Sequence, residues 1–206
     1  MAQYAKTAAV RRSIIEACSA AFSETGFHGA SMAEIARRAG ISHTGLLHHF
    51  PRKEDLLTEV LELQDERSAQ YLREHAGPSS DADPVHILEG MVATLVEMDR
   101  EVGLSELAAT LTGEASSPTH PAHAHFAERY RNIRRFLTRI YARLDAEERL
   151  APGADPAQLA VATIALSEGL RSQWLFDREG DLRIDAVVAT VVGMFVPETA
   201  GGATAD

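Results

Sequence analysis

Two serines on either side of a glycine, Ser31, Gly40 and Ser42, constrain the fold of this chain more than any other feature. Ser31 and Glu34 have the spacing of a capping box, so a short helix is expected to begin there and to end at Gly40. Ser42 then caps a further helix that runs to about Phe50. Two short helices joined by a tight turn predict a helix-turn-helix.

The rest of the sequence is also helical in pattern, because its apolar residues recur at steps of three and four rather than two. A stripe from Val10 to Phe22 predicts a first helix that Gly26 terminates. No strand-like alternation competes, so we expect an all-α protein. Five further helices are predicted. One begins at Lys53, and the others lie around residues 88–95, 126–144, 155–176 and 184–195.

These patterns predict two domains and a tail. Residues 1–52 form the helix-turn-helix domain, and residues 53–196 form a second helical domain. Residues 53–76 are expected to be a helix connecting the two, ending at a linker that begins with Gly77 and Pro78. The last residues, 197–206, are expected to be disordered.

Charge and composition limit the classes of function that the chain can have. The net charge is −10, yet residues 1–53 carry seven basic and three acidic residues, so this end alone is basic. A basic end on an acidic body would keep contacts with phosphate local to that end. Cys18 is the only cysteine, which excludes a disulfide framework and a cysteine zinc site. The sequence has no signal-like apolar region and no apolar run long enough for a membrane span, so we expect a soluble, cytoplasmic protein.

In a helix-turn-helix, the second helix enters the DNA major groove and its first residues face the base edges. Ser42, His43, Thr44 and Gly45 occupy these positions and are short enough for close approach. Further basic residues are placed to contact backbone phosphates, which fixes the register without reading sequence. These are Lys6 and Arg11, with Arg12, before the motif, and His48, His49 and Lys53 after it.

The segment Gly26–Leu57, GFHGASMAEIARRAGISHTGLLHHFPRKEDLL, resembles the DNA-binding signature of TetR-type transcriptional regulators. It departs from that pattern in two places, since Thr44 stands where glycine is usual and Leu47 where a phosphate-contacting tyrosine is usual. His48 is a candidate to replace the tyrosine. With the resemblance, the predicted DNA-binding residues are Lys6, Arg11, Ser31, Ser42, His43, Thr44, Gly45, Leu47, His48, His49 and Lys53.

The resemblance implies a homodimer that binds a palindromic operator, most simply as a repressor, and is released by a small, largely apolar effector. No cofactor and no catalytic residue is expected. The last two long helices would supply the dimer contacts, and the candidates there are Leu159, Leu166, Val188 and Val191. Aromatic and methionine side chains are candidates to line the effector pocket: Met91, Leu95, Met98, Phe126, Tyr130 and Trp174.

Two alternatives of other classes remain at this stage. His120, His123 and His125 lie close enough in sequence to converge on a metal, which would suit a metal-responsive regulator or a metal-dependent hydrolase. The second alternative is a binding or carrier module whose N-terminal helices pack on a protein partner. Salt-dependent binding to a DNA duplex would distinguish the regulator from both.

Overall fold

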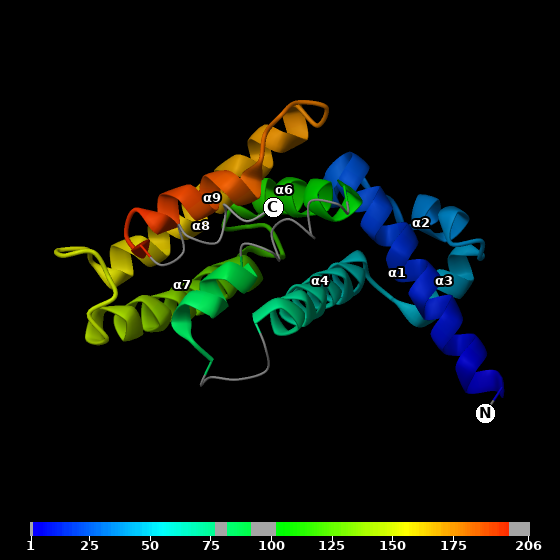
Figure 1. Cartoon of the computed structure of the whole chain (residues 1–206). Helices are drawn as coiled ribbons and strands as arrows, with labels where there is room; N and C mark the ends of the chain where they lie inside the picture. Colours follow the sequence, from blue (N-terminus) through cyan, green and yellow to red (C-terminus); the bar gives the residue numbers. More distant parts are fainter. Residues whose placement is uncertain (1, 77–81, 92–101, 198–206) are drawn as a thin grey trace. The chain divides into compact units, whose positions relative to one another are not determined.

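The computed structural model describes residues 2–76, 82–91 and 102–197, with side chains described over 7–74, 82–91 and 103–197. Within these ranges every regular element is a helix, which confirms the predicted all-α class (Figure 1). The predicted tail from 198 onward lies outside them. The helices are α1 (Ala2–Gly29), α2 (Met32–Arg38), α3 (His43–His49), α4 (Lys53–Ala76), α6 (Val102–Ala115), α7 (His123–Ala146), α8 (Pro156–Phe176) and α9 (Ile184–Gly193), and residues 84–91 are also helical.

The chain forms two compact units whose limits differ from the predicted domains. The first combines residues 1–67 with residues 102–126, and the second combines residues 68–101 with residues 127–206. The first half of α4 and all of α6 therefore belong with the helix-turn-helix. The sequence pattern placed both in the second domain, because a helix from a distant part of the chain gives no local sign of where it packs.

Helix α1 is interrupted at Gly26, where the sequence predicted its end. Gly26 has φ of 72° and ψ of 176°, a backbone conformation outside the helical region, and the last helical turn then continues to Gly29. Positive φ is costly for residues with a Cβ, so glycine is suited to this position. Ile14, Cys18 and Phe22 form the buried side of α1, as the stripe predicted.

The two serine caps are confirmed. The Ser31 hydroxyl accepts a hydrogen bond from the Glu34 amide at 3.2 Å, and the Ser42 hydroxyl accepts one from the Gly45 amide at 3.0 Å. Between the helices Gly40 has φ of 69°. The Gly40 amide donates to the Arg37 carbonyl and the Ile41 amide donates to the Ala36 carbonyl, which is a Schellman ending. The turn between α2 and α3 is thus held by the backbone itself.

The second unit has its own apolar core, formed by α7, α8, α9 and the helical residues 84–91. Leu137 and Leu144 of α7 and Val188 of α9 are among its most buried side chains. Asp155 caps α8 by accepting hydrogen bonds from the amides of Ala157 and Gln158. The part of the predicted apolar seam of α7 from Ile133 to Leu144 faces this core.

Candidate nucleic-acid interface

Helix α3 is anchored by one side and open on the other. Leu46 is fully buried, and the adjacent Phe50, which ends the helix, is also buried. The Phe50 amide donates to the Leu46 carbonyl at 2.8 Å, so the helix ends at its second anchor. Leu47, next in sequence to Leu46, is 38% exposed and faces away from the core.

The open side carries the residues predicted to face DNA. His43, Thr44, Leu47 and His48 are all exposed. Their positions along the helix place them on one side of it, since neighbours on a helical face lie three or four residues apart. We define these four residues as the α3 face. None of their side chains has a hydrogen-bond or ion-pair partner in the described part of the chain, so their polar groups are free for a partner.

Gly45 has a local reason to be glycine. A Cβ at this position would lie 3.1 Å from the Ser42 hydroxyl oxygen, which is tighter than ordinary contact. The glycine therefore leaves room for the hydroxyl that caps α3. Ser42 and Ser31, both predicted as DNA-binding residues, are exposed and each uses its hydroxyl as a cap.

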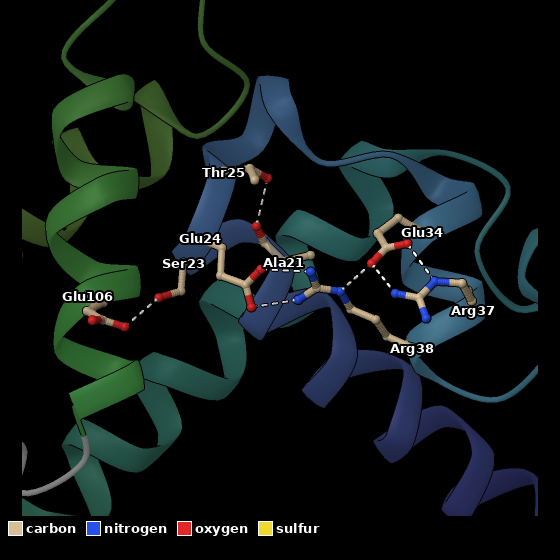
Figure 2. A network of polar contacts seen from close by, with 8 residues as sticks. All are labelled: Ala21, Ser23, Glu24, Thr25, Glu34, Arg37, Arg38 and Glu106. Atoms are coloured by element: carbon tan, nitrogen blue, oxygen red, sulfur yellow. Dashed lines mark hydrogen bonds and ion pairs between the residues drawn. The ribbon is translucent and has the colours of Figure 1, made fainter.

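Most of the basic residues near this face are already paired. Figure 2 shows Arg38 of α2 between two carboxylates, with 2.7 Å bonds to Glu24 of α1 and a 2.8 Å bond to Glu34. Arg37 bonds the same Glu34 carboxylate at 2.7 and 2.8 Å. These hydrogen bonds lower the pKa of Glu34 to about 2, so the carboxylate stays charged. The network ties α1 to α2 and neutralises much of the positive charge that the sequence places here.

Arg11 and Lys53 are also engaged within the first unit. The Arg11 guanidinium pairs with Glu59 and lies 4.5 Å from the centre of the Phe50 ring. The Lys53 ammonium donates to the carbonyls of Phe27 at 2.7 Å, Ala30 at 3.0 Å and His28 at 3.5 Å. Phosphate contacts by these two side chains would have to compete with the bonds they already make. Arg12 is exposed and makes no such pair among the described residues, and the side chain of Lys6 lies outside the described part.

The predicted pocket residues divide between the two units. Phe126 is buried in the first, while Met91, Tyr130 and Trp174 are partly buried in the second. Met91 and Trp174 pack against the core of the second unit, and the Tyr130 hydroxyl donates to the Glu168 carboxylate. Leu95 and Met98 lie outside the described residues.

The predicted dimer residues differ in exposure. Leu159 and Val188 are buried within their own chain, where they belong to the core of the second unit, so neither side chain is available to a second chain. Leu166 and Val191 are partly buried. The periodicity that selected Leu159 and Val188 identifies core positions and interface positions alike, because both are apolar.

The three clustered histidines each have a different environment. His120 is buried and its Nδ1 accepts a hydrogen bond from the Ala122 amide at 3.2 Å. His123 Nδ1 lies 2.8 Å from the Ala115 carbonyl oxygen, and His125 Nε2 lies 3.2 Å from the Asp65 carboxylate. In the described ranges no group of three histidine, cysteine or carboxylate side chains is placed to hold a metal ion. The metal alternative therefore finds no support in the geometry.

One part of the first unit has no counterpart in the sequence expectations. Helix α6 packs against α1 near Ser23 and Phe27, where Glu106, Thr110 and Glu114 form hydrogen bonds with α1. The apolar periodicity of Leu104, Leu107 and Leu111 is the only local signal of this helix. This periodicity does not reveal that α6 packs on α1, because the bonded residues of the two helices are more than eighty positions apart in the sequence. Two of the three bonds join residues 87 positions apart.

Comparisons with known proteins agree with a helix-turn-helix regulator. The sequence profile described as bacterial regulatory proteins, tetR family, matches residues 14–60. A second profile, described as BetI-type transcriptional repressor, C-terminal, matches residues 84–195. The chain is 31% identical over 166 residues to the HTH-type transcriptional regulator BetI of Yersinia pestis, covering 80% of this chain and 79% of that protein. The chain belongs to the TetR family of transcriptional regulators, and it is not an enzyme.

Solved structures show the same fold. A TetR-family regulator from Agrobacterium tumefaciens superposes with a TM-score of 0.77 at 18% identity, over 92% of this chain and 98% of that one. The SmeT–triclosan complex superposes with a TM-score of 0.74 at 20% identity, over 91% of this chain and 92% of that one. Among the described helices, none combines the length and apolar character needed to cross a membrane.

Proposed function

We propose that this regulator binds a palindromic DNA operator through the α3 face and represses the genes that the operator controls. The observation that carries the proposal is the contrast across α3. Leu46 and Phe50 fix the helix to the first unit, while His43, Thr44 and His48 leave their polar groups unpaired among the described residues. The BetI-type repressor profile that matches the second half of the chain supports repression rather than activation.

Within the α3 face, the first turn and the later residues have different roles. His43 and Thr44 follow the Ser42 cap directly, so they are the side chains that would reach base edges in the major groove. His48 lies further along the helix and would contact phosphate, together with Arg12 of α1, which is exposed and unpaired among the described residues. Leu47 gives this face an apolar group suited to a thymine methyl.

The operator would be palindromic because the protein would be a two-fold dimer. Helix α8 exposes a stripe of small and apolar residues in which Val161 is 51% exposed and Phe176 is 93% exposed. Ala162, Ala165 and Gly169 lie between them on the same side and would allow a second helix to approach closely. We define these five residues as the α8 stripe. Covering it would remove apolar surface from water, which favours association.

The effector would bind in the second unit and be mainly apolar. Met91, Tyr130 and Trp174 are partly buried there, a setting in which aromatic and methionine side chains can contact a ligand. The solved SmeT complex contains triclosan, an apolar compound, which makes triclosan a reasonable first trial ligand. Binding would weaken operator affinity if the ligand prefers a conformation that the operator does not.

DNA binding can be tested without knowing the operator. The wild-type protein is used to select duplexes from a randomised library, and the affinity for the selected duplex is measured over a series of salt concentrations. We expect a steep salt dependence and an affinity at least about a thousandfold above that for random duplex. A Thr44→Ala variant should lose part of this preference, whereas Gln70→Ala, at an exposed position of α4, should not. Failure of the wild type to enrich any sequence would refute sequence-specific binding.

A further inference from the structure

The break in α1 at Gly26 separates two backbone groups that an uninterrupted helix would join. In a continuous helix the Phe27 amide donates to the Ser23 carbonyl four residues earlier. At Gly26 a ψ of 176° turns the Phe27 amide away from the helix axis. Unpaired backbone groups are costly where water is excluded, so both need another partner.

Helix α6 supplies a partner to each of these groups. The Glu114 carboxylate accepts a hydrogen bond from the Phe27 amide at 2.7 Å. One turn earlier, the Thr110 hydroxyl donates to the Ser23 carbonyl at 3.4 Å. We call this pair of bonds the α6 splice, because two side chains of α6 replace the single bond that the break removes.

The splice also explains the residue at the break. A Cβ added to Gly26 would overlap a Glu114 carboxylate oxygen, far inside contact distance. Gly26 therefore permits the positive φ, and it also leaves the Glu114 carboxylate in the place from which it accepts the Phe27 bond, a place that a Cβ would force it to leave. The space beside Gly26 is thus occupied by a residue of a different helix, α6.

Phe27, whose amide bonds to Glu114, has further contacts with α4 and with His120. The Lys53 ammonium of α4 donates to the Phe27 carbonyl, and it lies 4.4 Å from the centre of the Phe27 ring. The buried His120 ring packs edge-on against the same ring, with centroids 5.2 Å apart. Phe27 leads directly into Ser31 and α2, so its position sets where the helix-turn-helix begins.

We propose that Glu114 is a positioning residue for DNA recognition, acting through the Phe27 amide to hold α2 and α3 in place. This inference rests on the proposed DNA binding and extends the DNA-binding unit to α6. The helix-turn-helix segment alone lacks Glu114 and leaves the Phe27 amide without this acceptor. Specific affinity then depends on a carboxylate of α6, a different helix from the one that carries the α3 face.

The test compares three single variants of the full chain. Glu114→Ala removes the acceptor, whereas Glu114→Gln keeps a side-chain oxygen that can accept the same bond. Glu106→Ala is the matched control, because Glu106 also faces α1 from α6 but accepts its bond from the Ser23 hydroxyl at 3.2 Å, within the regular part of the helix (Figure 2). All are compared well below their melting temperatures, so that each variant is fully folded.

Amide hydrogen exchange without DNA tests the splice directly. In Glu114→Ala we expect exchange at Phe27 to become roughly tenfold faster, since an amide that loses its acceptor opens more readily. Two further amides should also exchange faster: that of Ile41, which bonds back across the turn, and that of Leu46, which makes the first backbone bond of α3. The Leu159 amide in the second unit should not change. Glu114→Gln should restore slow exchange, and Glu106→Ala should leave Phe27 unchanged.

Duplex binding then tests the positioning role. In Glu114→Ala the ratio of selected-duplex to random-duplex affinity should fall by roughly tenfold, and Glu114→Gln should recover it. Unchanged exchange at Phe27 in Glu114→Ala would overturn the splice. Faster exchange at Phe27 with unchanged exchange at Ile41 and Leu46 would overturn the positioning role. If the wild type selects no duplex, the proposed function fails, and exchange still decides whether Glu114 positions α3.

Discussion

The outward sides of α3 and α8 are both open to solvent, yet they differ in length and chemistry. Helix α3 has seven residues and presents the histidines and threonine of the α3 face. Helix α8 has 21 residues and presents the α8 stripe, from Val161 to Phe176. Unpaired polar groups gain from a partner that offers hydrogen bonds and charge, whereas apolar surface gains from being covered. The difference suits α3 to DNA and α8 to a second copy of the chain.

The two helices also depend on different supports. A seven-residue helix is marginal by itself, so α3 relies on the Ser42 cap and on Leu46 and Phe50 as anchors. Helix α8 is long enough to bury Leu159, Ala160 and Leu170 along one side and still expose the other. Changes at single anchors should therefore affect α3 far more than α8.

The largest effect is expected at adjacent residues of α3. Leu46→Ala should reduce the free energy of unfolding by about 2–5 kcal/mol, because it leaves a cavity at a fully buried position. Leu47→Ala should change it by less than about 0.5 kcal/mol, since Leu47 is exposed. Urea denaturation measures both values. Similar losses in the two variants would contradict the assignment of the buried and open sides of α3.

The next effect concerns the α8 stripe. A Val161→Glu, Ala165→Glu double variant should weaken dimerisation by about 3 kcal/mol or more, because it would bury unpaired charges between the two chains. Sedimentation velocity over a concentration series measures the change. Ala142→Glu, at an exposed position of α7, is the control and should leave the assembly intact. A dimer that persists in the double variant would place the interface elsewhere.

A smaller effect follows from the buried His120. Burial lowers its pKa below the ordinary value of 6.5, so the folded state favours the neutral ring. Stability from this group is fully present above the unfolded-state pKa and is lost as the pH falls below it. Below that pKa the free energy of unfolding should decline with a slope of up to about 1.4 kcal/mol per pH unit from this one proton.

Denaturation of wild type and His120→Gln at a series of pH values isolates this contribution. The variant lacks the titrating ring, so its stability should fall less steeply than that of the wild type on the acidic side. Parallel curves for the two proteins would mean that His120 does not couple protonation to folding. The comparison uses slopes, so a uniform loss of stability in the variant does not obscure it.

The smallest effect distinguishes paired from unpaired arginines. Arg12→Gln should reduce the slope of log affinity against log salt by about 1, the value for one lost phosphate contact. Arg38→Gln should change it much less, since Arg38 already pairs with Glu24 and Glu34. Titrations of the selected duplex at several salt concentrations give both slopes. Equal reductions would mean that the network of Figure 2 opens when DNA binds.

Local features of this fold were predictable from the sequence, and distant contacts were not. The caps at Ser31 and Ser42 involve residues three positions apart, and the structure confirms both. The bond from Phe27 to Glu114 spans 87 positions, and no pattern in the sequence signals it. Apolar periodicity likewise marked Val188 as a candidate dimer contact, but it could not show that this side chain is buried inside its own chain. Exposure, which decides between core and interface, depends on the whole fold.

The central claim is that the α3 face reads DNA sequence. The most direct measurement repeats duplex selection from a randomised library with the wild type and with a His43→Ala, Thr44→Ala double variant. We predict that the variant still binds DNA but selects a relaxed or altered sequence at corresponding positions of both half-sites, because its base-contacting side chains are gone. Selection of the same sequence by both proteins, with the same discrimination at every position, would contradict the claim.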